Sequence, residues 1–318
     1  MPFAERAEPG RSRGLWWGAP LTLVAALAVG VVVWQTSVDY GPTPAFLHEA
    51  APAPREHERE ALGAGLVLAG SGSNLPVTRA LAIAYASEGG DAPVVHTSIG
   101  SGGGIRALQD GAIDIALISR PLKADERAAG LVAVPYARAP VVFAVHDSVT
   151  DRSIRAEQIV PIYAGEQAQW NDGTSIVVLQ REAGDSSHAA VARFLTGFDA
   201  ADEAAHARRR WRVLYNDAAM DDALASTEGA IGIVGSGALP EDLPIHALAL
   251  DGVEPNVANV ADGTYPLSKD LAFVTLGEPA GQAAELIRFA LSPAGRAVIE
   301  SHGCVPLGGD GPRRREGS

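Results

Sequence analysis

The chain has 318 residues, of which 47% are hydrophobic and 20% charged, a composition typical of globular proteins and unlike that of disordered or fibrous chains. Its 38 acidic and 25 basic residues give a net charge of −13, which argues against a nucleic-acid-binding protein. The single cysteine, Cys304, excludes an intramolecular disulfide and a cysteine-based metal cluster. The eight histidines lack metal-ligand spacing, so we expect neither a metal nor another cofactor.

The N-terminal region contains a long apolar segment without charge. Residues 15–34 are long enough, as a helix, to cross a hydrocarbon core of about 30 Å. Arginines precede this segment and Asp39 is the first charged residue after it, so the positive-inside rule places residues 1–14 in the cytoplasm. We expect residues 15–37 to be a transmembrane anchor, with a cleaved signal peptide as the alternative. The remainder would then lie on the extracytoplasmic, periplasmic face of the membrane.

Beyond this segment the sequence predicts a linker followed by an α/β fold. Residues 38–60 combine proline, alanine and charge without apolar periodicity, as linkers do. From there on, short apolar runs alternate with amphipathic segments, which is the pattern of helices packed on parallel strands. The expected strands are 65–70, 94–100, 113–119, 141–146, 175–180, 230–235 and 271–276.

Three of the expected strand-to-helix junctions are rich in glycine and hydroxyl residues. They lie at residues 70–74, 100–104 and 184–187. Glycine lets a ligand approach the backbone closely, and the start of a helix offers unpaired N–H groups with a partial positive charge. If the three turns converge, they would form an oxyanion site without a metal. The alternative is that each turn only caps its own helix.

Two arginines strengthen the first interpretation. Arg120 and Arg181 both end an expected strand, and a guanidinium group suits a tetrahedral oxyanion. A surface arginine paired with a nearby acid is the alternative. The sequence contains no phosphate-binding P-loop, dinucleotide fingerprint or serine nucleophile elbow. His188 directly follows Ser187, but the start of a helix disfavours a protonated histidine, so we expect no enzyme.

These turns, in this order, resemble those of the PstS-like phosphate-binding proteins of bacterial ABC importers, a family of periplasmic substrate-binding proteins. The resemblance extends from Leu66 to Leu307 and rests on short segments in the same order. These segments are GSGSNLP at 70–76, SIGSGGGIRAL at 98–108, ISRPL at 118–122, IYAGEQAQWNDG at 162–173, REAGDSS at 181–187, EGAIGIVG at 228–235, YPLSKDLAF at 265–273 and LSPAGRAVIESHGCVPL at 291–307.

The resemblance implies a two-lobed α/β fold of the type II periplasmic-binding-protein class, with a hinge that closes the lobes over the ligand. Lobe 1 would comprise residues 61–143 and 244–318, and lobe 2 residues 144–243. The segments 141–146 and 245–252 would be the crossovers between them. It further implies capture of inorganic phosphate for the permease subunits of an ABC transporter, by a chain that we expect to be a monomer.

Site residues carry over by position in the matching segments. The resemblance places Asn74 and the Leu75 N–H at the first turn, Ser101 at the second, and Arg181 as the ligand-binding arginine. Ser186 and Ser187 would donate through N–H and hydroxyl at the third turn. The expected ligand-binding residues are Ser73, Asn74, Leu75, Ser101, Gly102, Ser119, Arg120, Arg181, Asp185, Ser186 and Ser187.

The chain departs from the family pattern at two positions. Ser119 stands where some members have an aspartate, a group that can accept the proton of phosphate and would repel sulfate. Asp185 stands where serine is usual, and either caps its helix or restores the missing acceptor from the opposite lobe. The missing aspartate supports another oxyanion, such as sulfate, molybdate or tungstate, as an alternative ligand. The expected membrane anchor leaves open a further alternative, a membrane-anchored ligand sensor or interaction module with the same fold.

Overall fold

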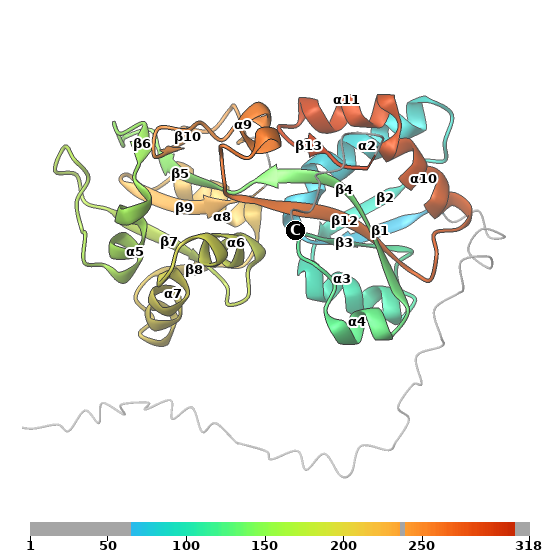
Figure 1. The fold of residues 1–318 in the computed structure, drawn as a ribbon, viewed down its shortest axis with the longest axis horizontal. Coiled ribbons are helices and arrows are strands. Elements are labelled where there is room, and N and C mark those ends of the chain that lie inside the picture. Colours follow the sequence, from blue (N-terminus) through green and yellow to red (C-terminus); the bar gives the residue numbers. More distant parts are fainter. Residues whose placement is uncertain (1–64, 236–238, 309–318) are drawn as a thin grey trace, which may run out of the picture. The chain divides into compact units, whose positions relative to one another are not determined.

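The computed structural model describes residues 65–235 and 239–308, which form two α/β lobes, each built on its own sheet (Figure 1). The predicted membrane span and linker lie outside these residues. Within the described ranges, no helix combines the length and apolar character that a bilayer crossing requires.

The first lobe contains a six-stranded sheet in the order β13-β4-β12-β3-β1-β2. Its parallel strands β1, β2 and β3 carry the first and second turns at their carboxyl ends, and β12 runs antiparallel to its neighbours β3 and β4. The strands are β1 (Val67–Gly70), β2 (Val94–Ser98), β3 (Ile115–Ile118), β4 (Leu131–Pro140), β12 (Ser268–Leu276) and β13 (Val305–Pro306).

Helices cover both faces of this sheet because its strands alternate buried side chains between two cores. Leu68 and Leu117 pack with the helices α2, α10 and α11, whereas Ala116 and Ile118 pack with α3. Cys304 is completely buried in the first of these cores. The elements are η1 (Gly72–Asn74), α2 (Leu75–Ser87), α3 (Gly100–Gln109), α4 (Ala124–Ala128), α10 (Gly281–Leu291) and α11 (Pro293–Ser301).

The second lobe contains a five-stranded sheet in the order β10-β5-β9-β7-β8. Its strands are β5 (Val142–His146), β7 (Val177–Arg181), β8 (Arg212–Leu214), β9 (Ala230–Val234) and β10 (Ile245–Ala247), and a small pair joins β6 (Ser153–Ile154) to β11 (Ala249–Leu250). Its helices are α5 (Ala156–Ala164), α6 (Ser186–Phe194), α7 (Phe198–Ala207), α8 (Asp217–Ala225) and α9 (Val257–Asp262).

Two expectations differ from the structure. Both sheets are mixed rather than parallel, because β12 and β13 in one and β5 in the other run antiparallel to their neighbours. The segments expected as crossovers, β5 and β10, are hydrogen-bonded neighbours at one side of the second sheet. The chain therefore passes between the sheets at Pro140–Val142 and again between Ala247 and Ser268. The lobe boundaries at 143/144 and 243/244 stay a prediction.

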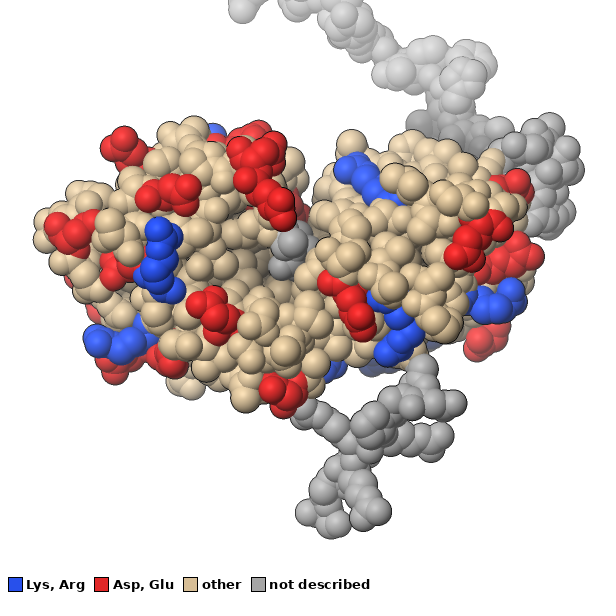
Figure 2. Space-filling model, turned by 90° about the horizontal axis from the view of Figure 1, so that it is seen from above, with Lys and Arg blue, Asp and Glu red and all other residues tan. Residues whose placement is uncertain are grey.

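Figure 2 shows one face of the molecule, hollowed between the two lobes, with acidic and basic side chains scattered over both of them. This arrangement places the carboxyl ends of β1 and β7 on opposite sides of the boundary between the lobes. The turns that follow these strands are the ones that the sequence singles out.

Candidate functional site

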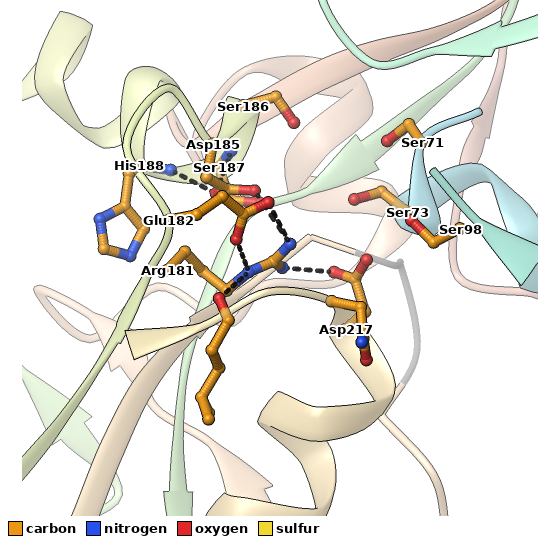
Figure 3. Close-up of polar contacts among 12 residues, drawn as sticks. Ser71, Ser73, Ser98, Arg181, Glu182, Asp185, Ser186, Ser187, His188 and Asp217 are labelled. Carbon is orange, nitrogen blue, oxygen red and sulfur yellow. Dashed lines mark hydrogen bonds and ion pairs between the residues drawn. The ribbon is translucent and has the colours of Figure 1, made fainter. Parts of the chain in front are cut away.

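A cavity of about 390 Å³ lies where the three glycine- and hydroxyl-rich turns meet. From the first lobe it is lined by Ser71–Ser73 and by Ser98–Gly103, and from the second lobe by Arg181–Ser186 together with Asp217. Figure 3 shows Ser71, Ser73 and Ser98 facing the Arg181 group from the opposite side. Both lobes thus contribute polar groups to one enclosed space.

The second turn presents the start of α3 to this cavity. Gly100, Ser101, Gly102 and Gly103 all line it, and they form the first helical turn, whose N–H groups have no partner within a helix. A Cβ atom at Gly104 would lie 2.9 Å from the Cα of Gly70, so glycine is required for α3 to pack this closely on the end of β1. The close packing fixes the start of the helix beside the first turn.

The third turn presents the start of α6. Gly184 adopts a left-handed conformation with φ of 83°, which turns the chain from β7 toward the helix. Asp185 caps α6: its Oδ1 accepts hydrogen bonds from the N–H groups of Ser187 at 2.9 Å and His188 at 3.0 Å. Its Oδ2 lies 3.5 Å from Nη2 of Arg181, which leaves this oxygen beside the cavity.

Arg181 is the central cation of the cavity and is only 4% exposed. Its Nε donates to Glu182 at 2.9 Å and to the carbonyl of Leu214 at 3.2 Å, and its Nη1 donates to Asp217 at 3.0 Å. Figure 3 shows the guanidinium held between these two carboxylates. The Arg181 side chain is therefore fixed in orientation before any ligand enters.

Burial and ion pairing act in opposite directions on these charges. Burial lowers the pKa of Arg181, but the carboxylates of Asp185 and Asp217 outweigh it and hold that pKa above its ordinary value. Burial raises the pKa of Asp185, but Lys269 and Arg181 outweigh it and hold this pKa below the ordinary range. Both groups are consequently charged at neutral pH.

A match to a protein-family model decides the family. A model described as the PBP superfamily domain matches residues 49–294. This chain belongs to the PBP superfamily. The phosphate-binding protein PstS of Bacillus subtilis (strain 168) is 26% identical over 261 residues, covering 79% of this chain and 83% of its own length.

Two solved structures are similar to this PBP superfamily chain. A substrate-binding protein of a phosphate ABC transporter from Clostridium perfringens, with bound phosphate, superimposes with a TM-score of 0.67 at 24% identity, covering 76% of this chain and 99% of its own. An ABC-type phosphate transport receptor from Vibrio cholerae superimposes with a TM-score of 0.55 at 21% identity, covering 76% and 99%. These similarities establish the two-lobed α/β fold.

Within this PBP fold, most of the predicted ligand-binding residues line the cavity. These are Ser73, Ser101, Gly102, Arg120, Arg181, Asp185 and Ser186. Ser119 lies behind them and links both lobes, because its Oγ is 2.7 Å from Oγ of Ser71 and 2.7 Å from Oγ of Ser186. Its N–H donates to Oγ of Ser101 at 3.3 Å. Ser119 therefore joins the three turns through its hydrogen bonds.

Asn74 and Leu75 are tied into the first lobe. Oδ1 of Asn74 accepts a hydrogen bond from the hydroxyl of Tyr136 at 2.9 Å, and Nδ2 is buried without a partner among the described residues. The N–H of Leu75 donates to the carbonyl of Gly72, in the 3-10 turn that precedes α2. The Leu75 N–H is thus already hydrogen-bonded in this structure.

Arg120 differs from Arg181 in how its guanidinium is engaged. It lines the cavity, but Nη1 and Nη2 donate to the two carboxylate oxygens of Glu126 at 2.8 and 2.6 Å. The hydrogen bond from Arg120 lowers the pKa of Glu126 and keeps that carboxylate charged. Arg120 therefore contributes charge that is largely balanced by its own partner.

Sequence reasoning missed three charged residues of the site. Glu182 and Asp217 hold Arg181, and Lys269 lies directly beneath the serines of the first and third turns. Asp217 lies 36 positions from Arg181, so no local pattern connects the two. Lys269 stands within the YPLSKDLAF segment, where a lysine beside the apolar run of a strand was the available signal.

The cavity has no feature of a metal centre. Within residues 65–235 and 239–308, no cluster of three or more histidine, cysteine, aspartate or glutamate side chains could hold a metal ion. Its donors are instead backbone amides, hydroxyls and a guanidinium, which are the groups that bind oxyanions.

Proposed function

We propose that this chain is the extracytoplasmic solute-binding protein of an ABC importer and captures inorganic phosphate between its two lobes. The observation that carries this proposal is the meeting of two helix starts and a serine-rich turn at the buried guanidinium of Arg181. A tetrahedral oxyanion matches these donors in charge and in directionality.

The predicted residues that line the cavity have a place in this proposal, whereas Asn74, Leu75 and Ser187 do not line it. Arg181 would neutralise charge, and the N–H groups at the start of α3 and the Ser186 N–H at the start of α6 would donate from opposite lobes, since the next two N–H groups of α6 are held by Asp185. Ser101 and Ser186, which line the cavity, would add hydroxyl donors. Because the donors come from both lobes, ligand binding would draw the lobes together about a hinge at their two connections.

Similar proteins support phosphate as the ligand. The Bacillus subtilis protein is named for phosphate binding, and the Clostridium perfringens structure contains bound phosphate. A substrate-binding protein of this kind delivers its ligand to permease subunits, so we propose those as its partners. We further propose that it performs no chemistry, acts as a monomer, and is held on the periplasmic face by residues 15–37.

A different oxyanion is the second candidate, and one observation favours it. Ser119 offers a hydroxyl where an acceptor carboxylate would select protonated phosphate over sulfate. We propose that Asp185 supplies this acceptor from the other lobe, since its Oδ2 lies beside the cavity and its pKa is lowered by Lys269 and Arg181, against the effect of burial. Without such an acceptor, sulfate, molybdate or tungstate would bind equally well.

Calorimetric titration of the full chain in detergent, dialysed free of phosphate, tests the function. We expect micromolar or tighter binding of phosphate and much weaker binding of sulfate, molybdate and tungstate. Tighter binding of one of the other anions would reassign the ligand. Absence of binding to all four would favour the sensor or interaction module.

The anchor needs a separate measurement. Intact mass of the protein extracted from membranes should equal that of the full chain if residues 15–37 remain as an anchor. A mass lacking the N-terminal region would identify that region as a cleaved signal peptide.

A further inference from the structure

Lys269 is a buried cation that touches the candidate site from behind. It lies near the start of β12 in the first lobe and is only 4% exposed. Its Nζ donates to Oγ of Ser73 at 2.7 Å, to Oγ of Ser186 at 3.0 Å and to Oγ of Ser187 at 2.7 Å. One ammonium group thus joins hydroxyls of the first turn and of the third turn, across the boundary between the lobes.

The chemistry of these groups fixes the direction of the three hydrogen bonds. An ammonium group has three donors and no acceptor, so all three serines must accept from Lys269. Each hydroxyl then keeps its own hydrogen for a different partner. Ser73 and Ser186 line the cavity, whereas Ser187 is buried, so Lys269 leaves the Ser73 hydrogen for the cavity and the Ser186 hydrogen for the cavity or for Oγ of Ser119 at 2.7 Å.

The charge balance gives Lys269 a second effect. Around Arg181, the carboxylates of Glu182, Asp185 and Asp217 outnumber the single guanidinium, which would oppose an entering anion. Burial holds the pKa of Lys269 below its ordinary value, and the carboxylates of Asp185 and Asp217 counter part of this effect. The positive charge of Lys269 offsets part of this negative charge at the site.

The backbone leaves room for this side chain. A Cβ atom at Gly235, which follows β9 in the second lobe, would lie 2.5 Å from both Cε and Nζ of Lys269 and 2.6 Å from Oγ of Ser187. Glycine at this position allows the ammonium group to reach the serines of the opposite lobe. The space around Lys269 is thus shaped by both lobes.

We propose that Lys269 determines the ligand charge of this site, by orienting the serine hydroxyls as donors and by supplying the positive charge that a divalent oxyanion requires. This inference rests on the proposed function. If Lys269 served only stability, its removal would lower the stability of the fold. Removing Lys269 leaves the buried carboxylates of Asp185 and Asp217 with less compensating charge and lowers stability in either case, so the phosphate affinity per folded molecule decides between the two roles.

The test compares Lys269→Met with Lys123→Met in the full chain. Lys123 lines the same cavity but is exposed and has no side-chain contact with these serines among the hydrogen bonds of the described residues. We expect Lys269→Met to weaken phosphate binding by about 30-fold or more, as for the loss of charge-assisted hydrogen bonds, and Lys123→Met by less than about 3-fold. Affinity is measured per folded molecule at a temperature below the melting temperature of each variant, because removing one charge from a buried group also lowers stability.

Three results would overturn this inference or its basis. Phosphate binding by Lys269→Met within about 3-fold of the parent protein would refute the role of Lys269 and leave the proposed function intact. A lowered melting temperature with unchanged affinity per folded molecule would assign Lys269 to stability alone. If the parent protein binds no oxyanion, the proposed function itself fails. Should Lys269→Met not fold, Lys269→Gln, which is uncharged but forms hydrogen bonds, provides the same comparison.

Discussion

Nη1 of Arg181 lies 3.0 Å from Oδ1 of Asp217, although the two residues are 36 positions apart on different elements. Asp217 is the first residue of α8, and Arg181 is the last residue of β7. The end of a strand and the start of a helix in the second lobe thus meet through one ion pair. This pair, with Glu182, sets the plane of the guanidinium that faces the first lobe (Figure 3).

The first prediction concerns this geometry. Arg181→Lys keeps the charge but cannot donate to Asp217, Glu182, the Leu214 carbonyl and a ligand at once, because the planar guanidinium has five donors and an ammonium only three. We expect phosphate affinity to fall by about 100-fold, measured by calorimetry. Arg120→Lys is the matched control, since it makes the same change in an arginine whose donors go to Glu126. Equal losses in the two variants would contradict a special role for Arg181.

The second prediction concerns anion selectivity. Asp185→Asn retains an oxygen that can cap α6 but loses the charge and adds an amide donor, which sulfate can accept from. We expect the preference for phosphate over sulfate to fall by about 10-fold or more, measured by parallel titrations with both anions. Asp185→Ser should act in the same direction. Asp217→Asn is the comparison: a larger loss of preference there would make Asp217 the proton acceptor instead.

The third prediction concerns ionic strength. The charged groups that would hold the ligand are buried, and the whole chain carries a net charge of −13, so long-range attraction contributes little. We expect phosphate affinity to fall by less than about 3-fold between roughly 20 and 150 mM sodium chloride. A loss of several-fold or more over this range would indicate an exposed site in which diffuse charge does the binding.

The fourth prediction concerns stability and pH. Burial, with the nearby charges of Asp217 and Asp222, raises the pKa of Asp221 to about 7. The unfolded chain, with an aspartate pKa near about 4, therefore binds fewer protons than the folded chain between pH ~4 and ~7, and stability falls as pH rises through that window. Asp221→Asn should raise the free energy of unfolding by on the order of 2 kcal/mol at pH ~8 and have little effect at pH ~4.

Urea denaturation at both pH values measures this difference. Asp222→Asn removes only one of the two charges that raise the pKa of Asp221, so it should give a smaller change in the same direction at pH ~8. A pH-independent effect of Asp221→Asn would refute the link to proton binding.

The pattern of apolar and polar residues in short stretches of the sequence was enough to predict much of this fold. Apolar runs located seven strands, and the glycine- and serine-rich junctions correctly marked the turns that line the cavity. The ten-residue strand β4 was missed because prolines interrupt its apolar pattern at Pro135 and Pro140. The antiparallel returns were also missed, because strand direction depends on long-range connections that no short window of sequence records.

The ion pairs and hydrogen bonds that form among the charged residues of the site were harder to predict. That Arg120 pairs with Glu126 whereas Arg181 faces the cavity depends on which acid lies close in space. Lys269 was overlooked for the same reason, because its three partners, Ser73, Ser186 and Ser187, lie far from it in the sequence. Donor-rich turns can be recognised from sequence, whereas the charges that orient them require the assembled lobes.

The burial of Cys304 has a practical consequence for following ligand capture. This cysteine is the only one in the chain and is fully enclosed in the core of the first lobe, and burial raises its thiol pKa to about 12. The native thiol should therefore remain silent toward maleimide dyes while the protein is folded. One cysteine introduced at the rim of the cavity would then accept a fluorophore selectively, making the protein a single-site reporter of its own ligand.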